Sequence, residues 1–404
     1  MRQIHCFPVL MVFAVSILAA GMAEADDGLS LSGTLTATTG IGLDEDDQGR
    51  AAYDAELRLI LENTARGALG FRVEGGFRWA YGLLSPISIL LDSGLALPPP
   101  EESLLPGTDL HREFYLDQAY AKARMGNLEL RAGLFPLAWG AAYFYNPTAR
   151  TGTPVMPGEN LEDRSGKPGM ALSLALPFGL SLEAYALAQG RHTAGIPDID
   201  ELVLADVPWG SRLQLRTDCL DVSASIMKVL PKEGALAGSW LGFDMALTMG
   251  ILSFYSELVS NLDEMEASIG FWWPVPEKAV DLRGEYIWLQ GGGVDPADYE
   301  VAALLSGTAS LLGQSYVFLG MEKEDPQAAS WKLSLGTLVN LNDWSAGLLA
   351  EFAWMPVQDF ALSVFARVFT GGGNDEFGGS LSPAPGLSII PYRSISGLIV
   401  SWNF

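Results

Sequence analysis

Apolar and polar side chains alternate along most of this chain in stretches of about ten residues, separated by short turns or longer polar loops. In residues 51–62, apolar residues such as Leu57 occupy one phase of the alternation and charged residues such as Arg58 occupy the other. Successive side chains of a strand point to opposite faces, so each stretch predicts a β-strand with one apolar and one polar face. The same pattern recurs in residues 67–79 and 280–290.

The connections between these stretches alternate between short and long. Short turns containing proline, glycine or asparagine are predicted at residues 63–66, 125–127, 177–179, 274–278 and 356–359. Another turn is predicted at residues 217–220. Longer loops are predicted at residues 81–111, 140–167, 190–207, 291–313 and 371–391. The stretches predict an all-β fold: a transmembrane, antiparallel, up-and-down β-barrel of about 16–18 strands with both termini in the periplasm. Residues 112–124, whose phase is ambiguous, and residues 314–325 are the weakest strand predictions.

The chain ends on an aromatic residue that continues this alternation. Leu398, Val400, Trp402 and Phe404 share one phase, as in the last strand of an outer-membrane barrel. Chain ends are usually frayed and polar. We therefore expect Trp402 and Phe404 to form the signal that the barrel-assembly machinery recognises, the alternative being an ordinary terminal strand.

The first 25 residues have the organisation of a secretory signal peptide. A basic start precedes an apolar run at residues 9–20 and a small-residue site at residues 23–25. We expect residues 1–25 to be removed and residues 26–404 to form the barrel, reaching the outer membrane with the help of periplasmic chaperones. Cys219 would then be the only cysteine, so no internal disulfide is expected.

The composition fits a barrel because many apolar residues occur without a membrane helix. Hydrophobic residues make up 49% of the chain, which contains 45 Gly, 11 Trp and 12 Tyr. The nearest candidate helix, residues 80–97, is interrupted by Pro86 and Asp92. A barrel of this size encloses more volume than side chains fill, so a water-filled lumen or an inserted loop is expected. The predicted first strand begins at Leu29, which leaves no room for an N-terminal plug domain.

Charged side chains in the inward phase are the candidate functional residues. The net charge of −24 makes nucleic acid an unsuitable partner. Outer-membrane lipid is expected as a partner because the outer face of the barrel would be apolar. Candidates for lining a pore are Glu56, Arg58, Arg72, Glu74, Arg78, Glu129, Arg131, Arg212, Arg216, Asp281, Arg283, Glu285, Glu351 and Arg367. Further acids in the inward phase are Asp54, Asp244, Glu257 and Glu266. Such residues set ion selectivity, or pair across strands and stiffen the wall.

Catalytic chemistry finds little support in the sequence. After the predicted signal peptide, the only histidines are His111 and His192, both in predicted loops. Asp109 and His111 are the one pair that offers an acid/base site. No His/Cys spacing typical of a metal site occurs, and the glycine runs lack the lysine of a phosphate-binding loop. We predict neither an enzyme nor a cofactor.

One segment resembles a known group of barrels. It comprises the strand at residues 128–135, then Trp139-Gly140, then Asn146-Pro147-Thr148, then residues 166–169. This order is similar to porin-like barrels of the alginate-export type and related families of unknown function. The chain departs from that pattern at residues 134–135, where a basic residue and glutamine are common, and at Ala149, where aspartate is common. We expect Trp139, Gly140, Asn146 and Pro147 to shape the base of a long loop, with direct solute contact as the alternative.

Two functional hypotheses follow from the sequence. The first is an outer-membrane porin, monomeric or homotrimeric, through which small polar or charged solutes diffuse. The second is a non-conducting surface barrel whose loops bind a partner or plug the lumen. The two hypotheses differ in where they place residues 83–105, an apolar loop containing Pro98-Pro99-Pro100. The sequence leaves open whether this loop lies inside or outside the lumen.

Overall fold

The structure is a computed structural model of the whole chain. It describes residues 29–43, 49–63, 69–81, 111–137, 139–149, 166–188, 207–229, 238–261, 263–301, 311–325, 330–373, 375–378 and 393–404. The predicted signal peptide and the loop at residues 83–105 lie outside these described residues.

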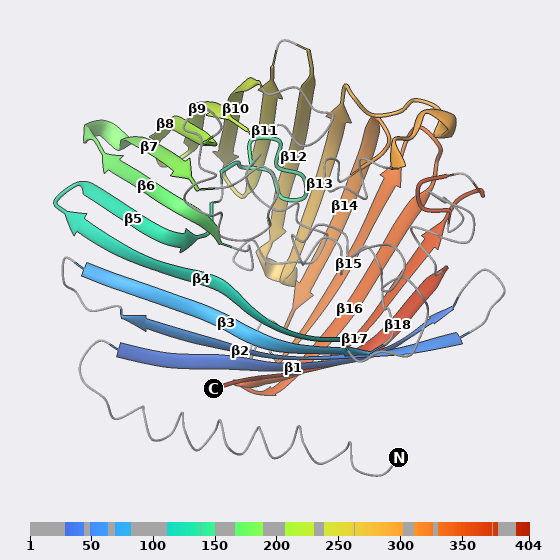
Figure 1. Cartoon of the computed structure of the whole chain (residues 1–404). Coiled ribbons are helices and arrows are strands. Elements are labelled where there is room, and N and C mark those ends of the chain that lie inside the picture. Colours follow the sequence, from blue (N-terminus) through green and yellow to red (C-terminus); the bar gives the residue numbers. More distant parts are fainter. Residues whose placement is uncertain are drawn as a thin grey trace.

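Eighteen antiparallel strands form one closed sheet (Figure 1). They are β1 (Leu29–Leu43), β2 (Gly49–Asn63), β3 (Leu69–Tyr81), β4 (His111–Met125), β5 (Leu128–Phe135), β6 (Lys167–Ala175), β7 (Leu180–Leu187), β8 (Trp209–Arg216), β9 (Leu220–Lys228), β10 (Ser239–Met249), β11 (Leu252–Ser260), β12 (Met265–Val275), β13 (Val280–Leu289), β14 (Ser315–Glu324), β15 (Trp331–Asn340), β16 (Ala346–Val357), β17 (Phe360–Thr370) and β18 (Ser394–Asn403). Each strand pairs with its neighbours in the sequence, and β1 pairs with β18. The predicted all-β barrel is confirmed, at the upper end of the expected strand number.

The barrel closes where β1 meets β18. The pairing runs from Thr34 opposite Asn403 to Leu43 opposite Ser394. Phe404 extends it, because its N–H donates to the Gly33 carbonyl at 3.0 Å and its carbonyl accepts from the Gly33 N–H at 2.9 Å. The Phe404 ring covers Gly33 so closely that a Cβ atom at residue 33 would collide with it. Glycine at this position thus lets the last aromatic ring pack onto the first strand.

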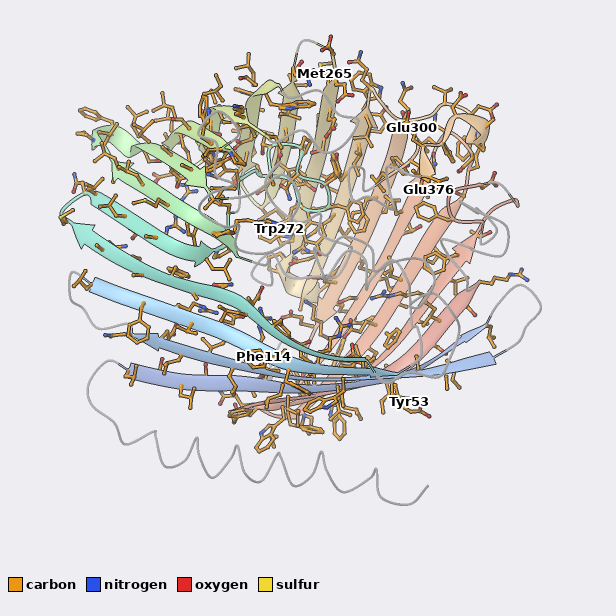
Figure 2. The ribbon with its side chains drawn as sticks, viewed as in Figure 1. Tyr53, Phe114, Met265, Trp272, Glu300 and Glu376 are labelled. Atoms are coloured by element: carbon orange, nitrogen blue, oxygen red, sulfur yellow. The ribbon has the colours of Figure 1, made fainter. Side chains whose placement is uncertain are left out.

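The register places apolar side chains on the outer face and charged side chains on the inner face. On β2, Tyr53 and Leu59 are exposed, and Tyr53 points away from the barrel interior in Figure 2. Arg58, in the opposite phase, forms ion pairs with Glu74 and Asp117 inside the barrel. An apolar outer band combined with a polar interior is the pattern of a transmembrane barrel.

A β-bulge in β4 explains why the phase of residues 112–124 is ambiguous. Glu74 of β3 pairs with Gln118, whereas the adjacent Gly75 pairs with Leu116, so the register skips Asp117. Asp117 and Gln118 are both buried, while Leu116 is exposed. The alternation therefore changes phase within the strand, as a bulge requires. His111, expected in a loop, instead begins β4.

Short turns connect the strands at one end of the barrel, and the longest connections lie at the other end, here called the mouth. The short turns include Gly126-Asn127, where Gly126 has φ +59, and the 3-10 helices η2 (Pro177–Gly179) and η5 (Pro276–Lys278). The 3-10 helix η6 (Pro296–Asp298) lies in the β13–β14 connection at the mouth. No helix among the described residues combines the length and apolarity needed to cross a bilayer.

We expect Phe404→Ala to weaken the closure of the barrel. The substitution removes the ring that covers Gly33, so the free energy of unfolding should fall by on the order of 1 kcal/mol. Urea unfolding of the detergent-solubilised barrel, followed by its heat-modified migration on a gel, measures the change. Phe352→Ala is the matched control, because Phe352 is also a lipid-facing aromatic residue exposed on the outer face. Equal effects of the two substitutions would contradict a special role for the Phe404 contact.

Candidate functional site

The connection between β5 and β6 enters the barrel instead of standing above it. Residues 139–149, here called the lumen loop, lie beside the inner face of β11 and β13 (Figure 1). They are held there mainly by carboxylates that project from these strands. The lumen loop narrows the interior and is the central feature of the candidate site.

Glu257 of β11 holds both ends of the lumen loop. Its carboxylate accepts hydrogen bonds from the backbone N–H groups of Ala141, Ala142 (2.6 Å) and Thr148 (3.1 Å). The Thr148 hydroxyl donates to the same carboxylate at 2.7 Å. Glu257 is only 2% exposed, so these donors replace the water that its carboxylate would otherwise bind.

Glu285 of β13 holds the middle of the lumen loop in the same way. It accepts from the backbone N–H groups of Tyr143 (3.1 Å), Phe144 (3.0 Å) and Tyr145 (2.8 Å). The Tyr255 hydroxyl also donates to it, at 3.0 Å. A buried loop must satisfy its backbone N–H groups, and ionised acceptors form the stronger hydrogen bonds. Two wall glutamates thus supply what a partner strand would otherwise supply.

Side chains of the lumen loop add contacts with the wall. The Trp139 indole N–H donates to Glu183 of β7 at 3.0 Å, and the Tyr145 hydroxyl donates to Glu266 of β12 at 2.7 Å. Phe144 stacks on Phe318 of β14, with ring centroids 4.8 Å apart. The loop is therefore tied to the wall from β7 to β14.

Arg283 of β13 lies against the ring of Tyr143. Its guanidinium carbon is 3.9 Å from the ring centroid, a close cation–π contact. The same guanidinium lies 3.6 Å from Glu322 of β14. Arg283, one of the candidate pore-lining residues, therefore joins the charged wall to the lumen loop.

Small residues on both sides make room for the loop. Gly140 has φ +110, and a Cβ atom there would collide with the Glu257 carboxylate and the Asn146 side chain. On the wall, a Cβ atom at Gly242 would approach Thr148. Pro147 is fully buried. Trp139, Gly140, Asn146 and Pro147, expected at the base of a long loop, thus all belong to the inserted segment.

Three of the candidate pore-lining residues are buried in the wall. Arg212 is 7% exposed and donates to Ser223 and to Asp244, both at 2.7 Å. Glu285 and Glu74 are each 2% exposed, the first beneath the lumen loop and the second between Arg58 and Arg72. Side chains this deeply buried cannot meet a passing solute. In this structure these three side chains support the wall and the lumen loop.

Another part of the wall, from β2 to β5, carries charged residues that are paired and also reach solvent. Arg72 lies 2.6 Å from Glu74 and 3.2 Å from Glu62, yet its side chain is 30% exposed. Arg78 lies 2.7 Å from Asp54 and is 21% exposed. Arg131, 3.5 Å from Glu129, is 30% exposed. The two interpretations of these residues, wall pairing and pore lining, are therefore compatible here.

The remaining candidates differ in their surroundings. The Tyr115 hydroxyl donates to Glu56, whereas Arg216 pairs with Asp221 at 2.8 Å, next to a short turn. Inner-face positions are given by the register to Asp281, Glu351 and Arg367. Within the described ranges, no cluster of three or more His, Cys, Asp or Glu residues is arranged to hold a metal ion.

The sequence identified Glu257 and Glu285 as inward acids but did not show that they bind a loop. One available signal is the character of their cross-strand neighbours. Glu257 pairs with Asp244 and Ser268, and Glu285 pairs with Gly270 and Phe318. An inward acid whose cross-strand neighbours are not basic needs another donor, and here the donor is the backbone of the loop. Glu183, which accepts from Trp139, was not among the candidates.

Comparison with known proteins gives matches in structure only. No family model matches the chain, and no curated protein matches it. Among solved structures, OccAB3 of Acinetobacter baumannii is similar with a TM-score of 0.55 at 11% identity, covering 93% of this chain and 99% of that one. OccK2 (OpdF) of Pseudomonas aeruginosa, solved in complex with glucuronate, is similar with a TM-score of 0.55 at 12% identity, covering 93% and 98%.

A third similar structure is OpdQ of Pseudomonas aeruginosa, with a TM-score of 0.52 at 13% identity, covering 94% of this chain and 99% of that one. Identities this low establish the fold and nothing more. The fold that they support is a closed, eighteen-stranded barrel. They do not support the specific likeness to alginate-export barrels, so that expectation is corrected.

We expect Glu285→Gln to loosen the lumen loop. An amide cannot accept three N–H groups as a carboxylate does, so amides 143–145 should exchange with solvent about 10- to 100-fold faster, equivalent to a loss of about 1–3 kcal/mol. Hydrogen exchange of the folded barrel measures this. Glu129→Gln is the matched control, because Glu129 also lies on the inner face but bonds Arg124 and Arg131 and not the loop. Unaltered exchange in Glu285→Gln would contradict the anchoring role.

Proposed function

We propose that this protein is an outer-membrane channel through which small polar or charged solutes diffuse. The lumen loop narrows the passage on the side of β7–β14, and the charged residues of β2–β5 line its other side. Solutes would move down their gradients without chemical change. Fixed charges of both signs would orient them as they pass.

The observation that best supports this proposal is the difference in solvent exposure between arginine side chains in two parts of the inner wall. The side chain of Arg212, in the part that supports the lumen loop, is 9% exposed. Arg72 and Arg131, in the other part, are each 30% exposed on the inner face. Guanidinium groups reached by solvent inside a barrel indicate a wet passage. That passage would run along β2–β5.

The similar structures support this proposal at the level of the fold. OccK2 (OpdF), solved with glucuronate, shows that a barrel of this fold holds a small sugar acid. Exposed arginines such as Arg72 and Arg131 would suit a carboxylate of that kind, since guanidinium groups bind carboxylates in bidentate geometry. We extend only this solute class, small and polar or charged, to the present chain.

The proposal includes a cellular setting. A cleaved signal peptide, periplasmic chaperones and recognition of Trp402 and Phe404 by the assembly machinery would deliver the barrel to outer-membrane lipid. The short turns would then face the periplasm and the mouth would face outward. A monomer and a homotrimer are both compatible with this setting. The alternative function, a non-conducting barrel with its lumen plugged, is tested by the same experiment as the channel.

Conductance of the refolded protein in a planar bilayer tests the proposal. Stable steps on the order of a nanosiemens, or a sizeable fraction of it, are expected from a wet lumen of this width. A correctly folded, heat-modifiable barrel that gives no steps would overturn the channel and favour the plugged alternative.

Neutralising the exposed arginines should change ion selectivity. Arg72→Gln with Arg131→Gln removes two positive charges from the passage, so the reversal potential should shift toward cations by on the order of 10 mV in a tenfold salt gradient. Lys278→Gln with Lys323→Gln is the charge-matched control. Lys278 lies in the η5 turn, and the register places Lys323 on the outer face. The same shift in both variants would mean that Arg72 and Arg131 do not line the passage.

A further inference from the structure

Another buried carboxylate joins the connections at the mouth. Glu376, in the segment that follows β17, lies near the upper rim in Figure 2 and is 5% exposed. It accepts hydrogen bonds from the Leu312 backbone N–H at 2.9 Å, from the Asn340 amide at 2.8 Å and from the Tyr316 hydroxyl. These donors come from the β13–β14 connection, the end of β15 and the start of β14. One side chain therefore fastens three parts of the mouth.

Asp343 forms the other half of this arrangement. It accepts from the Glu376 backbone N–H at 2.8 Å, the Tyr299 hydroxyl at 2.8 Å and the Ser345 backbone N–H at 2.8 Å. The Asn340 amide lies between the two acids, 2.8 Å from Glu376 and 3.3 Å from Asp343. We call Tyr299, Leu312, Tyr316, Asn340, Asp343 and Glu376 the mouth cluster.

The mouth cluster contains two acids and no base. Residues 291–322 and 368–392, which include the β13–β14 and β17–β18 connections, contain no lysine, arginine or histidine, and neither do residues 333–366 between them. The other acid beside Glu376, Asp375, accepts from the Gly372 backbone N–H of its own segment. Among the described residues, the groups that hydrogen-bond the Glu376 carboxylate are all neutral donors.

Burial and the charge of Asp343 work against ionisation of Glu376. Removal from water and the nearby Asp343 raise the pKa of Glu376, whereas the hydrogen bonds from Tyr316, Leu312 and Asn340 lower it, and the net result is a pKa of about 7. Burial and the bond to Asp343 raise the pKa of Tyr299 above its ordinary value, so this phenol stays neutral at physiological pH. Glu376 is thus the group in the cluster that titrates near neutrality.

Packing connects the mouth cluster to the lumen loop. Phe377 and Leu311, each next to a residue of the cluster, pack against the apolar cluster that contains Phe144 and Phe318. Phe144 belongs to the lumen loop and stacks on Phe318. A movement of the Glu376 segment would therefore withdraw apolar contacts from the loop that narrows the lumen.

We propose that Glu376 is a proton-controlled latch, which holds the connections of the mouth together when it is neutral and loosens them when it ionises beside Asp343. The loosening reaches the lumen loop through Phe377 and Leu311. This goes beyond passive diffusion, since it makes the mouth of the barrel responsive to external pH.

The direction of the effect follows from proton binding. In the closed latch, the pKa of Glu376 is about 7, whereas after opening the carboxyl returns toward its ordinary value of 4.5. The closed form binds the proton more tightly, so its stability is fully present below pH 4.5 and falls as the pH rises to about 7. Above that pH both forms are ionised and the stability no longer changes.

Hydrogen exchange measures the latch without requiring conduction. The Leu312 and Glu376 amides are its reporters, because each donates to one of the two acids. With the intrinsic base catalysis of exchange divided out, we expect their protection to fall by up to about tenfold per pH unit between pH 5 and 7 and to level off above. Protection that is flat over this range would overturn the latch and leave the channel proposal untouched.

Three variants of the cluster make the test specific. Glu376→Gln cannot ionise and should show flat protection at every pH. Asp343→Asn removes a neighbouring negative charge, so protection should level off at a lower pH than in the wild type. Tyr316→Phe removes a donor to the carboxylate, so protection should level off at a higher pH. Shifts in the same direction for both, or unchanged midpoints, would contradict control by Glu376. Heat-modified migration on a gel identifies any variant that fails to fold.

Glu300→Gln is the matched control. Glu300 lies at the same mouth, is labelled near Glu376 in Figure 2 and is exposed. Its substitution removes one acid from the mouth without touching the cluster, so the pH profile should remain that of the wild type. A flat profile in this variant would show that general surface charge, and not Glu376, controls the mouth.

If the barrel conducts, closures of the channel should change in frequency over the same pH range in the wild type and not in Glu376→Gln. If hydrogen exchange depends on pH but conductance does not, Glu376 acts as a latch at the mouth and its opening does not reach the lumen loop.

Discussion

A sheet in a bilayer must leave no strand edge unpaired, because lipid offers no partner for a free N–H or carbonyl. Here the pairing of β1 with β18 meets that requirement, and Phe404 continues it onto Gly33. Once the sheet is closed, the two-residue period decides which side chains face outward and which face inward. The apolar outer band and the charged interior are both consequences of closure.

Closure also leaves an interior space that wall side chains do not fill and that the lumen loop partly occupies. An eighteen-stranded barrel is too wide for wall side chains to fill, so part of the chain can enter it. The backbone of such a segment lacks a partner strand, and its N–H groups need acceptors. Glu257 and Glu285 supply them, whereas Glu74 of β3 and Asp54 of β2 pair with arginines. Inner-face acids thus have two roles, decided by what lies opposite them.

The strands, their faces and the sites of most short turns could be predicted because each depends on local alternation and turn residues. The β4 bulge at Asp117 could not, since it depends on the pairing of β4 with β3. The path of residues 139–149 also escaped prediction. It depends on contacts of Trp139 with Glu183 and of Phe144 with Phe318, which are distant in sequence. The local alternation of residues determines the strands of the wall, whereas contacts between residues distant in sequence determine which segment occupies the lumen.

The lumen loop and the mouth cluster use the same chemistry with different mechanical results. The lumen loop is one short segment, and both of its glutamates belong to strands that are paired on either side. The mouth cluster instead joins separate connections through a few bonds to Glu376 and Asp343, and Glu376 itself lies outside any strand. Opening it breaks few contacts and disturbs no pairing of the sheet. Local opening favours regions with few buried contacts. A carboxylate without a basic partner can therefore hold a loop rigidly when it belongs to a paired strand, as Glu257 and Glu285 do. It can also hold a segment that opens locally when it lies outside the strands, as Glu376 does.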